Sequence, residues 1–241
     1  MTEPRAAFYA ARRGGWRDWW TVLHPPYTAW HLSYVALGAA LAPHCDAGRL
    51  GVTVLAFLAA VGVGAHAVDE LQGRPLRTGI SDRALWIAAV GGVTVAVGLG
   101  ALGVARVGWV LLPFIVVGPA LVVAYNAELF GGMVHTDVGF AVAWGAFPVL
   151  TAYAAQAGGL GWPAGLGAVA AFFISYAQRA LSTPARLLRR RARAVTGSVE
   201  LADGPPLTLD AAVLLAPLER ALQALSWGMV ALAAAAVAFR L

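Results

Sequence analysis

The chain has 241 residues, of which 60% are hydrophobic and only 12% are charged. A soluble domain carries about 25% charged residues, so the composition excludes an ordinary soluble protein and indicates a polytopic membrane protein. The formal net charge is +5, and the single cysteine, Cys45, excludes both an intramolecular disulfide framework and a cysteine-cluster metal site.

The first 25 residues are polar, basic and rich in tryptophan. The opening stretch MTEPRAAFYAARRGGWRDWW has no apolar core, so it does not have the pattern of a signal peptide. Arginines that contact headgroups and tryptophans in the aromatic belt, here Trp16, Trp19 and Trp20, are typical of a membrane interface. We therefore expect residues 1–25 to be an interfacial segment and residues 26–241 to be a single transmembrane helical domain.

Seven later segments are apolar enough to cross a bilayer, which takes roughly 20 residues of helix. The expected spans are 26–43, 50–70, 84–104, 108–127, 138–157, 162–181 and 217–239. Residues 207–215 are only mildly apolar, so we expect either an interfacial helix or part of the last span there. The sequence predicts an all-α membrane bundle of about seven transmembrane helices.

The arginines predict how this bundle is oriented. Alternate connections hold most of them: the N-terminal tail, the loop after the second span, and an Arg-rich loop at about 182–210. The opposite side carries Arg49, Arg106 and Arg240. Because basic loops stay in the cytoplasm, we expect a cytoplasmic N-terminus in a bacterial cytoplasmic membrane. The run RLLRRRAR is interpreted first as an anchor on anionic membrane lipids, and its short juxtamembrane form argues against nucleic-acid binding.

This orientation collects ionisable residues at one face of the membrane, where charged groups are costly and are usually functional. The residues are His24, His31, His66, Asp69, Glu70, Glu128, His135 and Asp137. Only His44, among the histidines, is expected on the other side. We predict that most of them line one site that faces the cytoplasm.

The spacing of some of these residues suits a metal ion. His66, Asp69 and Glu70 are three and four positions apart, so a helix presents them on one side. The same spacing builds dinuclear carboxylate sites in helix bundles. The candidate ligands are His31, His66, Asp69, Glu70, Glu128 and His135. Imidazoles favour iron, zinc or manganese, whereas oxygen ligands favour magnesium.

Simpler interpretations stay open for several of these residues. Asp69 and Glu70 are also consistent with solvated carboxylates at a helix end, and His31 with an interfacial ring bonded to a carbonyl. His24 is then an ordinary loop residue, and Asp137 is the N-cap of the next helix.

Arg74 and Arg77 follow directly after the acidic pair. Arginine forks hold phosphate well. A carboxylate-bound cation beside two arginines, opening into an apolar bundle, fits an amphiphile with a diphosphate head. The alternative is that both arginines only mark a cytoplasmic loop.

The order of these motifs resembles the UbiA superfamily of intramembrane prenyltransferases. RPLRTGIS, after a helix that ends in an acidic pair, resembles that family's first aspartate-rich loop. HPPYTAWHLSYVALGAALA resembles its first span, AYNAELFGG its tyrosine-bearing segment, and GFAVAWGAFPVLTAYAA its fifth helix. The resemblance implies a helical bundle around a central cavity, with magnesium held between two acidic motifs and a prenyl chain transferred from its diphosphate.

The resemblance also implies roles for particular residues. Asp69 and Glu70 would bind magnesium, and Tyr125 and Asn126 would steady a carbocation or an acceptor. Arg74 and Arg77 match the family's turn by position and would bind the diphosphate. Where the second acidic motif is expected, we expect Arg179 and Arg186 to take the place of a second magnesium in binding the substrate. The departures indicate a divergent, shortened member, because the first motif lacks its later aspartates and YAQRALSTPARLLRRR contains no carboxylate.

Three functions follow from these observations. The first is metal-dependent transfer of a prenyl group, or a related cyclisation, acting on an isoprenoid diphosphate or another lipid-like substrate. The second is a membrane-embedded His/carboxylate metalloenzyme with iron, zinc or manganese, acting in redox or hydrolytic chemistry. The third is a lipid-binding partner subunit that has lost catalysis. The sequence does not indicate an oligomeric state.

Overall fold

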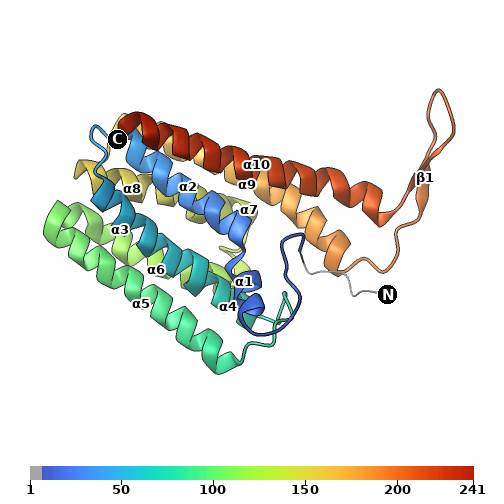
Figure 1. Ribbon diagram of the computed structural model, residues 1–241, viewed down its shortest axis with the longest axis horizontal. Coiled ribbons are helices and arrows are strands. Elements are labelled where there is room, and N and C mark those ends of the chain that lie inside the picture. Colours follow the sequence, from blue (N-terminus) through green and yellow to red (C-terminus); the bar gives the residue numbers. More distant parts are fainter. Residues whose placement is uncertain (1–6) are drawn as a thin grey trace.

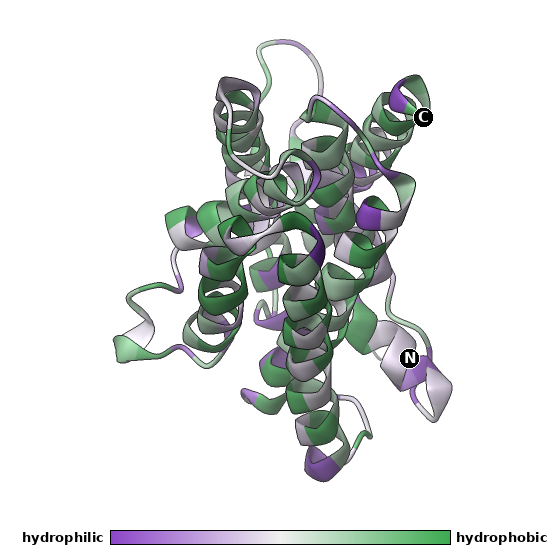
Figure 2. Ribbon diagram, turned by 90° about the vertical axis from the view of Figure 1, so that its left-hand side faces the viewer, coloured by the Kyte–Doolittle hydropathy of each residue, from purple (hydrophilic) through white to green (hydrophobic). Residues whose placement is uncertain are grey.

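The computed structural model describes residues 7–241 and shows a bundle of long helices (Figure 1). The expected all-α membrane bundle is confirmed. Within the described residues, six helices are long and apolar enough to cross a membrane: Ala47–Leu71, Asp82–Val107, Trp109–Asn126, Asp137–Ala157, Trp162–Arg190 and Ala211–Arg240. Most positions along the helices are apolar, with hydrophilic positions scattered among them (Figure 2).

A seventh apolar helix, α2 (Pro25–Leu41), is 17 residues long and occupies the middle of the bundle. It packs against α8 (Phe147–Ala157) and α10 (Ala211–Arg240). Its side chains Trp30, Tyr34 and Val35 are completely buried. With α2 included, the helices agree with the seven spans expected from hydropathy.

A short helix, α1 (Trp16–Leu23), precedes α2. It buries Asp18 and Thr21 and exposes its three tryptophans, so it is amphipathic. Its placement at the membrane interface stays a prediction. His24, expected to be an ordinary loop residue, is instead a buried joint between α1 and α2 in the left-handed conformation.

Two of the spanning helices contain a π-helical section. In one, α3 (Ala47–Phe57) continues through η1 (Leu58–Ala65) into α4 (His66–Leu71). In the other, α7 (Asp137–Phe140) continues through η4 (Ala141–Ala146) into α8. The section η1 packs on α5 (Asp82–Val107), and η4 packs on α9 (Trp162–Arg190). Such sections often occur at functional sites, because they interrupt the regular backbone hydrogen bonds.

The third spanning unit consists of η2 (Trp109–Leu111) and α6 (Leu112–Asn126). The chain leaves the α-helix after Asn126, close to the expected end of this span at residue 127. A short 3-10 turn, η3 (Phe130–Gly132), follows, and its Gly131 and Gly132 have positive φ angles of 68° and 78°.

The predicted Arg-rich loop is shorter than expected. The helix α9 does not end near residue 181 but continues to Arg190, and α10 begins at Ala211 instead of residue 217. An ion pair between Arg189 and Glu219 holds these extensions together. Between them, β1 (Gly197–Val199) and β2 (Leu207–Leu209) form an antiparallel hairpin that projects from the bundle (Figure 1). Residues 207–209 are therefore a strand, and not the interfacial helix that was one expectation.

Candidate functional site

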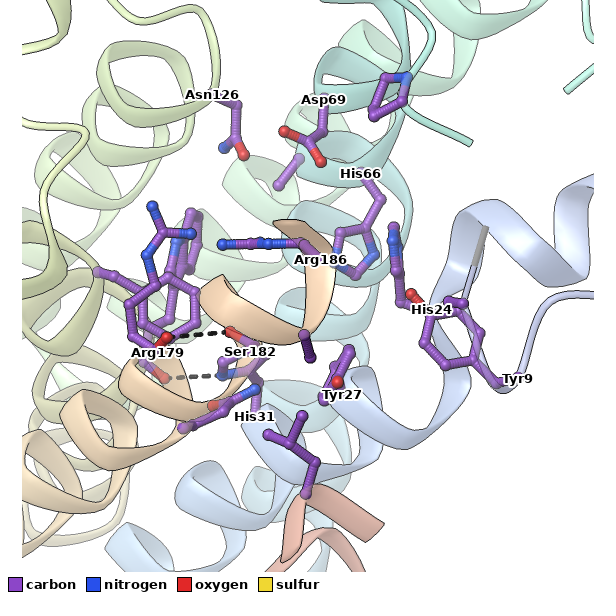
Figure 3. Close-up of a pocket in the computed structure, with 18 of the residues that line it drawn as sticks. Tyr9, His24, Tyr27, His31, His66, Asp69, Asn126, Arg179, Ser182 and Arg186 are labelled. Atoms are coloured by element: carbon purple, nitrogen blue, oxygen red, sulfur yellow. Dashed lines mark hydrogen bonds between the residues drawn. The ribbon is translucent and has the colours of Figure 1, made fainter. Parts of the chain in front are cut away.

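A cavity of about 310 Å³ lies at the end of the bundle where α2 begins and α4 and α6 end (Figure 3). The N-terminal segment, the turn after α6 and the second half of α9 complete its lining. The structure brings most of the predicted site residues to this cavity: His31, His66, Asp69, Tyr125, Asn126, Glu128, His135, Arg179 and Arg186. The predicted convergence at one end of the bundle is therefore what the structure shows.

Backbone carbonyls orient the histidines of the cavity. The Nδ1 atom of His31 lies 3.0 Å from the carbonyl oxygen of Trp144, and Nδ1 of His66 lies 3.1 Å from that of Gly62. Both carbonyls belong to the π-helical sections, η4 and η1. Because a carbonyl only accepts, Nδ1 of His31 is the donor, and its Nε2 carries the lone pair of the neutral ring.

His24 adds a second imidazole beside His66. The two ring centroids are 4.3 Å apart, and Nδ1 of His24 donates to the carbonyl oxygen of Val22 at 2.7 Å. Burial lowers the pKa of His24 well below its ordinary value, and the neighbouring His66 lowers it further. His24 is therefore a neutral group at physiological pH, and a proton on it is strongly disfavoured.

Aromatic rings form one wall of the cavity. Tyr125 stacks on His135 with centroids 4.4 Å apart and meets Trp144 edge-on at 5.7 Å. Phe140 lies 5.7 Å from the ring of His31. Several aromatic rings therefore line one space, and the face of an aromatic ring attracts a cation.

Two buried polar atoms at this wall have no hydrogen-bond partner among residues 7–241. They are the hydroxyl of Tyr125 and Oε1 of Gln178, on side chains that are 5% and 3% exposed. Unsatisfied buried polar atoms are rare in folded proteins, so each one calls for an explanation. A bound molecule with a polar group would satisfy both.

Four arginines of α9 line the cavity, and Figure 3 shows two of them, Arg179 and Arg186. Nε of Arg179 donates to Oδ1 of Asp137 at 2.9 Å, and its guanidinium lies 5.6 Å from the Phe140 ring centroid. Arg186 lies about two helical turns further along α9, and its one side-chain hydrogen bond within residues 7–241 is a long one of 3.4 Å to the Thr183 hydroxyl. The predicted N-cap at Asp137 is wrong: Thr136 is the cap, and its Oγ1 accepts from the Gly139 N–H at 2.9 Å.

Glu70, predicted as a catalytic residue and metal ligand, does not line the cavity. It is completely buried, and its carboxylate accepts from the Leu76 N–H, the Thr78 N–H and the Thr78 hydroxyl at 2.8–2.9 Å. Its helix ends one residue later and the chain folds back over the carboxylate, which turns it away from His66 and Asp69. This role for Glu70 is therefore corrected: it organises the following turn.

Arg74 and Arg77 also lie outside this cavity. Arg74 donates to the carbonyl oxygen of Ile80 at 2.6 Å and pairs with Asp82. Both arginines line a neighbouring cavity, so the predicted diphosphate-binding set is divided between two places.

The predicted metal centre is not assembled. Residues 7–241 contain no group of three or more His, Cys, Asp and Glu placed to hold a metal ion. The six candidate ligands fail to form one because Glu70 faces the turn and the imidazoles are held against separate helices by backbone carbonyls. Asp69 remains as a carboxylate that lines the cavity and makes no hydrogen bond with the described residues.

Other lining residues were not singled out from the sequence. They are Tyr9, Tyr27, Gln178, Ser182, Arg189, Arg190 and Glu219. Gln178 carried the clearest available signal, since it is an amide inside an apolar helix beside Arg179. No such signal marks Tyr9 and Tyr27 in the sequence, because tyrosines at a membrane interface are common.

No protein-family model matches the chain, and neither does any curated protein. Among solved structures, a UbiA homolog from Archaeoglobus fulgidus bound to Cd²⁺ is similar, with a TM-score of 0.51. The match covers 91% of this chain and 83% of that one, at 15% sequence identity. The chain has a UbiA-like fold. At this identity the likeness shows the fold alone, and the UbiA-like arrangement of helices agrees with the order of motifs in the sequence.

Proposed function

We propose that this protein is a membrane enzyme that transfers a prenyl group from an isoprenoid diphosphate or a closely similar amphiphile. One observation carries the proposal. A cavity in a UbiA-like bundle combines the guanidinium groups of Arg179 and Arg186 with a wall of aromatic rings. The arginines suit a diphosphate, and the rings suit the positive charge that develops when an allylic diphosphate ionises.

The bond changes in this reaction are simple. The C–O bond between the allylic carbon and the diphosphate breaks, and the diphosphate leaves with the electron pair. A nucleophilic atom of the acceptor forms the new bond to that carbon and loses its proton to a base. Nε2 of His31 is our candidate base, because Nδ1 of the ring is held by the Trp144 carbonyl oxygen and Nε2 is left to accept a proton.

The other cavity groups hold the reactants in place. Arg179 and Arg186 bind the departing diphosphate, and Asn126 is anchored through its Nδ2 to the Val122 carbonyl oxygen at 2.8 Å. The unpaired hydroxyl of Tyr125 and the amide of Gln178 orient a polar group of the acceptor.

The donor set does not fit a metal centre built by protein ligands alone, but it fits magnesium that arrives with the substrate. Mg²⁺ is commonly held by one or two carboxylates together with substrate phosphates. Asp69 is the residue that would hold it, and bound there it would neutralise charge on the leaving diphosphate.

The test uses purified protein in nanodiscs. It measures the binding of farnesyl and geranylgeranyl diphosphate, and the release of diphosphate from them in the presence of a lipid extract. We expect Arg186→Gln to lower release by about 100-fold, since it removes a charged group that stabilises the leaving group. Arg220→Gln is the matched control, because Arg220 is exposed and lines neither cavity. Equal release by Arg186→Gln and Arg220→Gln would contradict the proposal. Binding that depends on Arg186 without any release would indicate the lipid-binding subunit instead.

A further inference from the structure

A second cavity, of about 1320 Å³, adjoins the first at the same end of the bundle. The N-terminal segment, the turn after α4 and the end of α9 line it, and we call it the arginine vestibule. Eight arginines and a single carboxylate, that of Asp18, are among its lining residues. This excess of positive charge is concentrated in a concave surface, where it attracts anions more strongly than on a flat one.

The one carboxylate is occupied by the backbone. Asp18 is 5% exposed, and it accepts from the Gly14 N–H and the Gly79 N–H, both at 3.1 Å. It forms no ion pair with an arginine of the vestibule in the described chain. Its role is to fasten the turn after α4 to the segment before α1.

That turn holds two arginines in an unfavourable conformation. Arg74 and Arg77 have φ angles of 55° and 54°, a left-handed region that residues other than glycine rarely adopt. The hydrogen bonds of Glu70 to Leu76 and Thr78, together with that of Asp18 to Gly79, keep the backbone there. Strain that is maintained by its surroundings is typical of functional sites, because it fixes side chains before a ligand arrives.

The vestibule shares lining residues with the cavity of about 310 Å³ described above, which we call the main cavity. Arg186 and Arg190 line both. Arg12 and Arg77, in contrast, line the vestibule but not the main cavity, and their side chains make no hydrogen bond or ion pair with residues 7–241. Their guanidinium groups are therefore available to a ligand that stays outside the main cavity.

We propose that the arginine vestibule is an anion-binding site in its own right, which takes a phosphate group in addition to anything bound in the main cavity. Arginine forks match phosphate oxygens two at a time, so a diphosphate or a phosphate-bearing lipid headgroup has the right chemistry. The proposal does not depend on prenyl transfer, because the two arginines that its test replaces, Arg12 and Arg77, line only the vestibule of the two cavities and are not used by that reaction.

The experiment titrates inorganic diphosphate into the full-length protein in nanodiscs of phosphatidylcholine, followed by calorimetry. We expect Arg12→Gln/Arg77→Gln to weaken one class of binding by about tenfold or more, since charge-assisted hydrogen bonds are lost. Arg220→Gln is the control with the same chemical change, and we expect it to bind like the wild type. Arg179→Gln should spare this class, because Arg179 lines only the main cavity.

A second arm separates the two sources of phosphate. Nanodiscs that contain phosphatidylglycerol should weaken the vestibule's affinity for diphosphate if lipid headgroups occupy it, and the effect should disappear in Arg12→Gln/Arg77→Gln. If phosphatidylglycerol has no effect, the vestibule selects the free anion. Diphosphate affinity and stoichiometry in Arg12→Gln/Arg77→Gln that equal those of Arg220→Gln, with either lipid, would overturn the proposal. The single changes Arg12→Gln and Arg77→Gln, both at exposed side chains, guard against a folding defect in the double variant.

Discussion

The Glu70 carboxylate holds together the turn between α4 and α5. It is completely buried and satisfies two backbone N–H groups and one hydroxyl within that turn. A buried carboxylate is costly unless its oxygens are fully hydrogen-bonded, and here both oxygens have donors. The position of Arg74 and Arg77 therefore depends on Glu70, although Glu70 touches neither cavity.

Replacing this carboxylate by an amide tests its structural role. In Glu70→Gln, one side-chain oxygen becomes an NH₂ group that faces a backbone N–H donor. We expect a loss of about 1–3 kcal/mol in the free energy of unfolding, because a buried donor is left unsatisfied. Thermal unfolding in detergent measures it, with Glu200→Gln in the exposed hairpin as the control. Equal melting temperatures for the two variants would show that the turn does not need Glu70.

His24 makes stability depend on pH. Its pKa in the folded protein is lowered by burial first and by His66 second, with Arg186 and Arg190 acting in the same direction. The unfolded chain therefore takes up a proton first as the pH falls below about 6.5, the ordinary histidine value. The free energy of unfolding therefore keeps its full value above that pH. It decreases as the pH falls from 6.5 toward the folded-state pKa of His24, by up to about 1.4 kcal/mol per pH unit.

The measurement is melting temperature from pH 7.5 to 5.5. We expect His24→Asn to flatten the decrease seen in the wild type. His44→Asn should leave it unchanged, because His44 is exposed at the other end of α2. An identical pH profile for wild type and His24→Asn would rule out His24 as the titrating group.

At the scale of elements, α5 meets the bundle along a narrow stripe. It buries Leu85, Ala89 and Gly92, which are spaced so that they share one side of the helix. A Cβ atom added at Gly92 would lie 2.4 Å from the Ala59 carbonyl oxygen in η1. Small residues at such contacts let two membrane helices approach closely.

Adjacent glycines provide a matched test of this contact. Gly91→Ala points into open space, so it should be neutral or stabilising by up to about 1 kcal/mol through helix propensity. Gly92→Ala must push η1 and α5 apart, and we expect it to cost about 1–3 kcal/mol. Unfolding of the two variants in detergent gives the comparison, and equal stabilities would contradict the close approach.

Hydropathy predicts the existence of the helices but not where all of them end. The last turns of α9 carry several arginines, so they leave the apolar window, yet they remain helical because Arg189 pairs with Glu219 on α10. That pair joins residues distant in sequence, and no local pattern reveals it. The π-helical sections were not foreseen either, because their composition is as apolar as the helix around them.

At the scale of the whole molecule, the sequence predicts which end of the bundle carries the site, since alternate helix ends must meet. It does not predict that the residues at that end are divided between two cavities. Whether Arg77 joins Arg179 depends on the fold of the turn over Glu70. The lack of a hydrogen-bond partner for Oε1 of Gln178 among the described residues depends on packing between α9 and its neighbours. Both are consequences of tertiary structure.

The separation of the candidate metal ligands allows a prediction of how much metal the purified protein contains. Residues 7–241 offer no group of three metal-binding side chains, so we expect purified protein to contain far less than one equivalent of iron, zinc or manganese. Elemental analysis by mass spectrometry after extensive dialysis measures this directly. One tightly bound equivalent of any of these metals would favour the metalloenzyme hypothesis over the proposed transfer reaction.

Membrane orientation follows from the arginines and can be tested with the protein's own cysteine. Cys45 lies in the connection between α2 and α3, at the end opposite to the arginine vestibule. If basic ends stay in the cytoplasm, Cys45 faces the outside and a membrane-impermeant maleimide should label it in intact cells. Because burial raises the pKa of the Cys45 thiol, labelling is carried out near pH 8, where more thiolate is present. Arg191→Cys in a Cys45→Ser background reports the other end and should be labelled only after lysis, so the reverse pattern would invert the assigned topology.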